Sequence, residues 1–265
     1  MLLLVLTAVT VAQDISWQPA LPRQGSLIEV FAPDAITGLV AGEPLHFRDG
    51  KALAAVPLAT TDSIAVQTLY IRWDGAVTGK KAYVHVEERA RSKEQLRVAE
   101  RFTPAPDSAL QERIDRERAL SRDAARRAHT VPKLWYRPFL RPRTTRVTSG
   151  FGGGRQVNGV WRSTHSGLDL AGRRGEPVQV SNRGVVALIG DFFYGGISVY
   201  VHHGEGVMTV YHHLSRALVA VGDTVQRGQV IGRVGATGRV TGPHLHWQAQ
   251  YGAIAFDPTD LLNLP

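Results

Sequence analysis

The chain of 265 residues carries a formal net charge of +8 and a hydrophobic content of 43%, which is enough apolar sequence for two modest domains with cores of their own. It contains no cysteine, so disulfide scaffolds, thiolate metal sites and cysteine nucleophiles are excluded. The basic charge suits an anionic partner, but no basic cluster is interleaved with aromatic residues and no recognition-helix motif is present, so we expect no nucleic acid binding.

The first twelve residues, MLLLVLTAVTVA, are apolar and end in small residues. This pattern is typical of the core of a secretory signal, and the run is too short to span a bilayer. Because no basic residue precedes it, a buried N-terminal strand is the alternative, and the true start of the signal is left open. We expect an exported protein that acts in a periplasm or outside the cell, without stable insertion into a membrane.

Residues 13–103 are predicted to form a small antiparallel β-sandwich, immunoglobulin-like in outline. Short apolar and β-branched runs alternate there with turn signals such as Asp49-Gly50. His46 and His85 have no partner at metal-ligand spacing, so we interpret them as partly exposed strand residues. Strands are expected at residues 26–31, 45–47, 64–73, 82–86 and 96–102.

Residues 104–133 are predicted to form a linker with a charged helix. Ser108 and Gln111 fit a capping box, and residues 111–127 carry only a thin apolar stripe. Because acidic residues lie throughout this stretch, we interpret it as a solvated connecting helix rather than a nucleic-acid-binding one. Three aromatic residues after it are expected to pack the linker onto the next domain: Trp135, Tyr136 and Phe139.

Residues 134–265 are predicted to form a second, glycine-rich β domain, which makes the chain mainly β. Glycines punctuate its turns, as they do in sheets that bend tightly around a cleft. No long helix is indicated. Antiparallel strands are expected at residues 177–180, 184–189, 197–202, 207–212, 229–234 and 244–250.

Seven of the ten histidines lie in this second domain. His244 and His246 are two residues apart in a predicted strand, so their imidazoles share one face. His165 precedes Asp169 by four residues. Imidazole and carboxylate are zinc ligands, and three protein ligands with one open position make a hydrolytic site. His165, Asp169 and either histidine of the 244/246 pair therefore form a candidate zinc site.

The remaining histidine of that pair is available to move protons, together with one residue of the adjacent pair His212 and His213. Adjacent residues of a strand face opposite sides, so at most one of these two is expected to face a common site. Spacing alone does not decide which histidine has which role.

Three motifs in this order resemble those of the LytM/lysostaphin-type zinc metallopeptidases, which cut peptide bonds in bacterial peptidoglycan. The similarity covers roughly residues 147–258 and implies a β catalytic domain of the duplicated-hybrid-motif kind. The three motifs are His165-x-x-x-Asp169, Tyr211-His212-His213-Leu214-Ser215 and Gly242-Pro243-His244-Leu245-His246.

The resemblance assigns a role to each of five residues. It implies that His165, Asp169 and His246 bind one Zn²⁺ per chain. It implies that His213 and His244 orient or deprotonate the attacking water and stabilise the tetrahedral intermediate. The resemblance gives no role to His202 or His212, and we expect both at exposed strand positions.

The function that follows is a zinc-dependent endopeptidase, expected as a monomer, that hydrolyses peptidoglycan cross-links in wall remodelling or lysis. Its substrates would be stem peptides and cross-bridges, cut at a D-alanyl to diamino-acid bond or in an oligoglycine bridge. The alternative is a catalytically degenerate relative that binds or activates another wall hydrolase. Because all five positions are filled, the enzyme is favoured.

Two further alternatives are excluded or disfavoured by composition. Residues 222–232 resemble the hairpin of biotinyl or lipoyl carrier domains, but a carrier needs a lysine there and the last lysine is Lys133. A structural zinc module would use four protein ligands, commonly cysteines, and the chain has none. Whether the first domain inhibits the second or targets it is left open.

Overall fold

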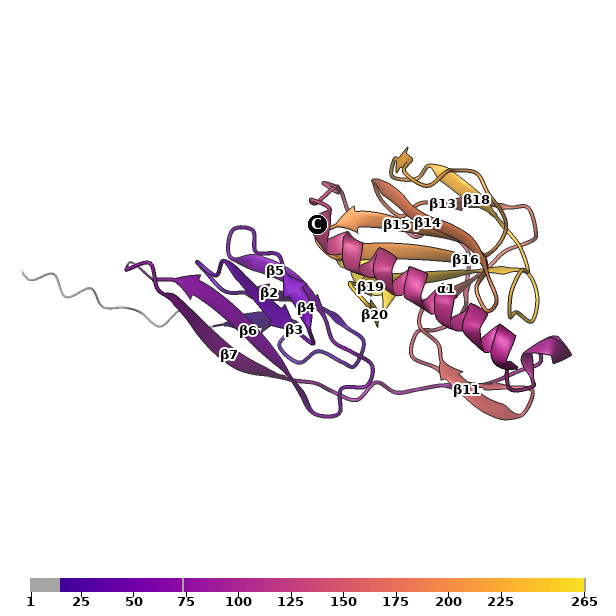
Figure 1. The fold of residues 1–265 in the computed structure, drawn as a ribbon, viewed down its shortest axis with the longest axis horizontal. Helices are drawn as coiled ribbons and strands as arrows, with labels where there is room; N and C mark the ends of the chain where they lie inside the picture. Colours follow the sequence, from indigo (N-terminus) through magenta and orange to yellow (C-terminus); the bar gives the residue numbers. More distant parts are fainter. Residues whose placement is uncertain (1–14, 73, 265) are drawn as a thin grey trace, which may run out of the picture.

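The computed structural model describes residues 15–72 and 74–264. The chain folds into a smaller N-terminal lobe and a larger C-terminal lobe, connected by an extended arm that leads into one long helix (Figure 1). Strands dominate both lobes, so the predicted mainly β class is confirmed. The predicted signal segment, residues 1–12, lies outside the described residues. Within the described ranges, no helix has the length and apolar character that a membrane crossing requires.

The N-terminal lobe consists of two antiparallel sheets that share one core. Residues of strand β6 alternate between buried and more exposed positions, which is the period of two expected for a sheet with one face inside. The shared core contains Ile28 and Val30 from one sheet with Val66 and Val84 from the other. The sheets are β1 (Ser16–Gln18), β2 (Leu27–Phe31) and β5 (Lys51–Ala55), and β4 (Glu43–Leu45), β3 (Thr37–Val40), β6 (Ser63–Ile71) and β7 (Val77–His85).

The extended arm differs from the predicted strand at residues 96–102. Strand β8 (Lys93–Leu96) comes earlier and pairs in parallel with β10 (Gly154–Val157) of the C-terminal lobe. Residues Glu100–Phe102 form a short 3₁₀ helix, η1. The prediction was wrong because Phe102 packs on Phe193, with ring centroids 5.0 Å apart, a long-range contact that no local pattern indicates.

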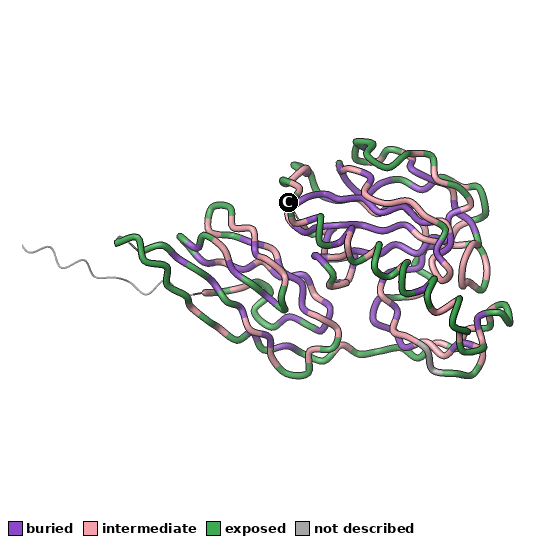
Figure 2. Tube along the Cα trace, in the orientation of Figure 1, coloured by how far each residue is buried: buried purple, intermediate pink, exposed green. Residues whose placement is uncertain are grey.

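Helix α1 (Ser108–Arg127) lies across the C-terminal sheet, with most of its surface exposed (Figure 2). Its N-cap is Asp107, whose side chain accepts a hydrogen bond from the Leu110 amide at 2.8 Å. The predicted cap at Ser108 is therefore wrong by one residue. A second 3₁₀ helix, η2 (Ala128–Thr130), follows. Ala124 and Ala125 pack against Met208 of the sheet, so small side chains hold the helix close.

The linker residues after α1 pack as predicted at two of three positions. Trp135 and Phe139 are buried in the core of the C-terminal lobe, and their rings contact one another edge to face at 5.6 Å. Tyr136 is 82% exposed, so its predicted packing role is wrong. It lies between the two buried rings in sequence and points outward because neighbouring residues of an extended segment face opposite sides.

The C-terminal lobe is built on a sheet of ten strands whose pairings are all antiparallel. All six strands predicted there are present. The central strands are buried on both faces and carry Tyr211 and Trp247 into the core. The strands are β9 (Val147–Ser149), β12 (Leu168–Ala171), β13 (Pro177–Gln179), β14 (Gly184–Phe192), β15 (Gly196–Gly204), β16 (Val207–Ala217), β17 (Thr224–Val225), β18 (Val230–Val234), β19 (His244–Tyr251) and β20 (Ile254–Phe256).

Outside this sheet, β11 (Val160–Thr164) forms a hairpin with β10, and a 3₁₀ helix, η3 (Pro258–Asn263), ends the described chain. The two lobes are in direct contact. Leu27 of the first lobe belongs to the core cluster of the second, and its amide donates to Asp260 at 2.8 Å. Arg89 forms an ion pair with Asp257 at 2.9 Å.

A pair of histidines also joins the lobes. His46 Nε2 lies 2.9 Å from His129 Nδ1, and His129 Nε2 lies 2.8 Å from a carboxylate oxygen of Glu43. His46 is therefore partly exposed, as predicted, but it lies just beyond β4 and forms a contact between the lobes. His85, on β7, is exposed as predicted, with 76% of its side chain accessible.

Candidate metal centre

Sheet register brings two of the predicted ligands side by side. In the β12–β19 pairing, Asp169 lies directly opposite His246. His165 lies just before β12, and Gly167 carries the chain between it and the strand. A β-carbon at Gly167 would lie 2.4 Å from the Trp247 carbonyl oxygen and 2.8 Å from His246 Nε2. Only glycine therefore lets this segment pass so close to His246.

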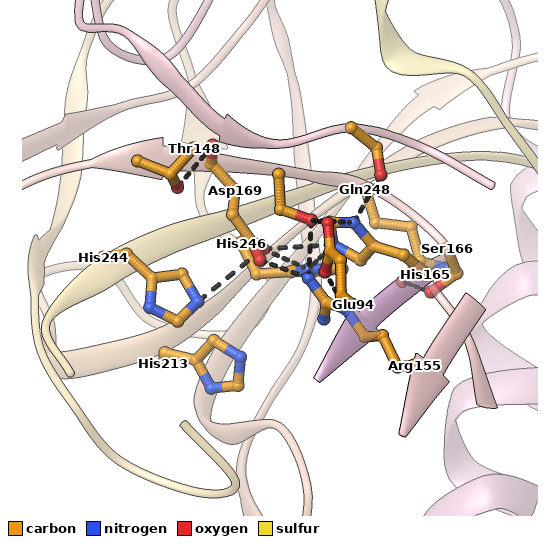
Figure 3. Close-up of polar contacts among 12 residues, drawn as sticks. Glu94, Thr148, Arg155, His165, Ser166, Asp169, His213, His244, His246 and Gln248 are labelled. Atoms are coloured by element: carbon orange, nitrogen blue, oxygen red, sulfur yellow. Dashed lines mark hydrogen bonds and ion pairs between the residues drawn. The ribbon is translucent and has the colours of Figure 1, made fainter. Parts of the chain in front are cut away.

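The three predicted ligands converge on one point (Figure 3). His165 Nε2 lies 3.0 Å from His246 Nδ1 and 3.1 Å from Asp169 Oδ1, and His246 Nδ1 lies 2.9 Å from the same oxygen. A tetrahedral zinc ion with bonds of about 2.0–2.1 Å separates its ligand atoms by about 3.3 Å. The donor atoms and their spacing therefore fit zinc with only a small expansion.

A hydrogen bond fixes the orientation of the first histidine. His165 Nδ1 donates to the carbonyl of Gly150 at 2.6 Å and lies 2.9 Å from Ser149 Oγ. A neutral imidazole that donates from Nδ1 has its lone pair on Nε2. The lone pair of His165 is therefore directed at the point where His246 and Asp169 meet, as a metal ligand requires.

The electrostatics of the cluster favour the protonation states that bind a metal. Burial alone would raise the pKa of Asp169, but the neighbouring imidazoles of His165 and His246 outweigh burial and hold that pKa well below its usual range. Burial lowers the pKa of His246 to about 4, against the opposing effect of Asp169. At neutral pH the carboxyl group is ionised and His246 is neutral, so neither must lose a proton before binding.

The two predicted catalytic histidines lie next to this cluster. The rings of His213 and His244 are 5.0 Å apart, and both line a groove of about 810 Å³ that reaches Asp169. His213 Nδ1 donates to the carbonyl of Thr237 and His244 Nδ1 to that of Gly242, each at 2.9 Å. In the neutral rings both Nε2 atoms are therefore free to accept a proton.

His213 occupies a backbone conformation that non-glycine residues rarely adopt. Its φ is 62°, and such left-handed geometry costs about 1–3 kcal/mol and is concentrated at functional sites. Its amide donates to the carbonyl of Gly195 at 2.9 Å, which holds the kink. Burial, and then the neighbouring His244, lower the pKa of His213 well below its ordinary value, so the ring is neutral.

The structure corrects the prediction that at most one of His212 and His213 faces a common site. The rings of both His212 and His213 approach His246, at 5.3 and 5.9 Å between centroids. Strict alternation fails because the φ of His213 turns the strand, and the β15–β16 register skips at this point. His212 is partly buried, contrary to prediction, and Ser198 Oγ lies 2.7 Å from its Nδ1.

His202 and His203 have structural contacts. His202 is only 5% exposed, and its Nε2 donates to the Ala124 carbonyl of α1 at 2.7 Å, so its predicted exposure is wrong. That prediction missed the helix, which covers this face of the sheet. His203 contacts the Arg183 carbonyl and Thr209 Oγ1, both at 2.8 Å. It is a buried structural histidine within β15.

Three residues around the ligands received no role from the sequence. Arg155 forms an ion pair with Asp169 Oδ2, and it also contacts Ser149 and Glu94. Ser149 and Arg155 fall in the stretch similar to the zinc peptidases, so position in that stretch was a usable signal for them. Glu94 comes from the arm of the N-terminal region, and no local pattern indicates it.

The buried histidines should make stability depend on pH. Burial lowers the pKa of His203 from 6.5 to about 4. Between these two pH values the imidazole is protonated in the unfolded chain and neutral in the folded chain. The contribution of His203 to the stability of the fold is therefore intact above pH 6.5 and is lost as the pH falls toward 4. We expect the free energy of unfolding to fall by about 2–3 kcal/mol for this residue alone between about pH 7.5 and 4.5, as urea titration would measure. The pH slope should be shallower by about one proton in His203→Asn; an unchanged slope would contradict the assignment.

Comparison with known proteins finds a family model that matches the segment containing these motifs. The model described as Peptidase family M23 matches residues 163–258. Over 84 residues, covering 32% of the chain and 20% of the relative, the chain is 50% identical to the peptidoglycan DD-endopeptidase ShyA of Vibrio cholerae serotype O1. Over 134 residues, covering 50% of the chain and 34% of the relative, it is 34% identical to the glycyl-glycine endopeptidase ALE-1 of Staphylococcus capitis. The chain thus spans about a fifth to a third of the length of these relatives.

A solved structure matches nearly the whole chain. It is described as a putative peptidase M23 from Pseudomonas aeruginosa, with 28% identity and a TM-score of 0.68. The match covers 91% of this chain and 95% of that one. The arrangement of both lobes is therefore found in a solved protein.

Proposed function

We propose that this chain, whose residues 163–258 match the model of peptidase family M23, is a zinc-dependent endopeptidase that hydrolyses peptide cross-links of bacterial peptidoglycan. The proposal depends above all on the convergence of His165, Asp169 and His246 beside a groove that Asp169 lines together with two further histidines. Relatives named as endopeptidases of peptidoglycan or of glycyl-glycine bonds support the substrate class. We place this activity in a periplasm or at a cell wall.

Each part of the site has a separate task in this proposal. A zinc ion held by His165, Asp169 and His246 would supply Lewis acidity, which polarises the scissile carbonyl and acidifies water. His213, neutral and with Nε2 unprotonated, accepts the proton of the attacking water. His244, whose ring lies 5.0 Å from that of His213, can also accept a proton at Nε2, and once protonated it donates a hydrogen bond from that atom to the oxygen on which negative charge develops.

The size of the groove suits a segment of peptide. The groove is about 810 Å³ and runs past Asp169, His213 and His244, with the arm at residues 94–98 forming one wall. A groove of this kind can bind the backbone on both sides of the scissile bond, as an endopeptidase requires. Binding on both sides also positions the bond against the reacting groups, which accounts for much of the rate gain in enzymes.

Removal and return of the metal test the proposal. A chelator is expected to abolish release of muropeptides from purified sacculi, and stoichiometric Zn²⁺ to restore it, because the ligands lie preformed in the fold. Mass spectrometry of products from a diaminopimelate-type and an oligoglycine-type wall identifies the bond. A metal-loaded protein that binds sacculi but releases nothing would contradict the enzyme and support a non-cleaving partner of another hydrolase.

A further inference from the structure

The metal centre has a contact with the N-terminal part of the chain. Strand β8 pairs in parallel with β10, and the register sets Glu94 directly opposite Arg155. Two glycines let the arm lie this close: a β-carbon at Gly152 would be 2.8 Å from the Arg89 side chain, and one at Gly153 would be 2.7 Å from Ser92 Oγ. The carboxylate of Glu94 therefore approaches the ligands from outside residues 163–258.

Glu94 binds both groups that hold the metal ligands in place. Its Oε2 accepts from Arg155 Nε at 3.1 Å, and its Oε1 accepts from the Ser149 hydroxyl at 2.6 Å. Arg155 Nη2 in turn donates to Asp169 Oδ2. Figure 3 shows Arg155 and Glu94 beside the three ligands, with His213 and His244 on the other side in this view.

These contacts specify the orientation of two ligands. With Oδ2 of Asp169 bound to Arg155, only Oδ1 faces His165 and His246. With its proton donated to Glu94, Ser149 Oγ can only accept from His165 Nδ1, which keeps the His165 lone pair on Nε2. The side chains involved are mostly shielded: 22% of Glu94 is exposed, 15% of Arg155 and 9% of Asp169. Ion pairs so placed are only weakly screened by solvent.

We propose that Glu94 is a positioning residue of the metal centre: through Arg155 and Ser149 it aligns Asp169 and His165, so the arm of the N-terminal region is part of the active site. Partners that orient metal ligands typically contribute about 10- to 100-fold to metal affinity. The role differs from that of a residue that merely docks the arm, because docking would leave the affinity for metal unchanged.

Zinc affinity of the full chain, measured by competition with a chromogenic chelator, tests the role. Glu94→Gln loses the charge and one acceptor, and we expect zinc to bind about tenfold more weakly; Glu94→Ala should approach 100-fold. The control is Glu100→Gln, an exposed position on the same arm, which should bind zinc as the wild type does. If Glu94 acts through Arg155, Glu94→Gln should have a smaller effect in the Arg155→Ala background.

The inference rests on the proposed zinc site, and the same titration separates the two. A wild-type chain that binds no zinc overturns both. A wild-type chain that binds zinc with the affinity of Glu94→Gln overturns only the role of Glu94. Thermal unfolding of the metal-free variants shows whether they fold; if Glu94→Ala does not, Glu94→Gln alone decides the question, because it keeps the size of the side chain.

Discussion

Replacing His165 with alanine is expected to abolish stoichiometric zinc binding and to reduce peptidoglycan hydrolysis by at least about a thousandfold. His165 is 1% exposed, and its Nε2 lies within about 3 Å of both other candidate ligands. Alanine would leave two ligands, and two are too few to hold zinc in a hydrolytic site. The measurements are metal content after dialysis and release of soluble muropeptides from sacculi.

The matched control for this experiment is His85→Ala. His85 is a histidine on an exposed strand of the N-terminal lobe, with 76% of its side chain accessible, so its removal should change neither metal content nor activity. Because alanine at a buried position also leaves a cavity, circular dichroism must show that His165→Ala is folded. A folded His165→Ala protein that keeps one zinc per chain and full activity would refute the metal site.

Local sequence was a good guide to the C-terminal lobe. Its strands carry apolar runs, and glycines mark their ends, so the strand positions followed from pattern alone. The five residues implied by the motifs lie within one site because β12, β16 and β19 are neighbours in one sheet. Spacing alone left open which histidine of the 244/246 pair binds metal. In the structure His246 Nδ1 lies 2.9 Å from Asp169 Oδ1, and His244 Nε2 lies 3.6 Å from it.

Contacts between distant segments were beyond the reach of local patterns. Glu94 meets Arg155 across 61 residues of sequence, and this pairing depends on how the arm crosses the C-terminal lobe. The sequence around His202 predicts an exposed strand residue, but helix α1 covers this side chain. The error at His212 has another cause: period-two alternation assumes a regular strand, and His213 interrupts it with a positive φ. In the first two cases a segment distant in sequence sets the environment, and in the last a positive φ interrupts the regular alternation.

Replacing His213 with alanine is expected to lower kcat by about 100- to 10,000-fold while zinc stays bound and KM changes little. The ring lines the groove beside His244 without belonging to the ligand cluster, so its loss should affect proton transfer alone. Steady-state cleavage of a defined muropeptide dimer, together with metal analysis of the same sample, measures both quantities.

The backbone at His213 calls for a second variant. Asparagine and histidine both occur comparatively often in the left-handed conformation, whereas alanine adopts it less readily. His213→Asn should therefore keep the kink, and hence the position of the strand, yet lose activity as fully as His213→Ala. If asparagine preserves the fold and restores the rate, the role of His213 is to shape the strand. If both variants are folded, hold zinc and fail to cleave, the imidazole itself is required, and His213 is the proton acceptor that the groove geometry favours.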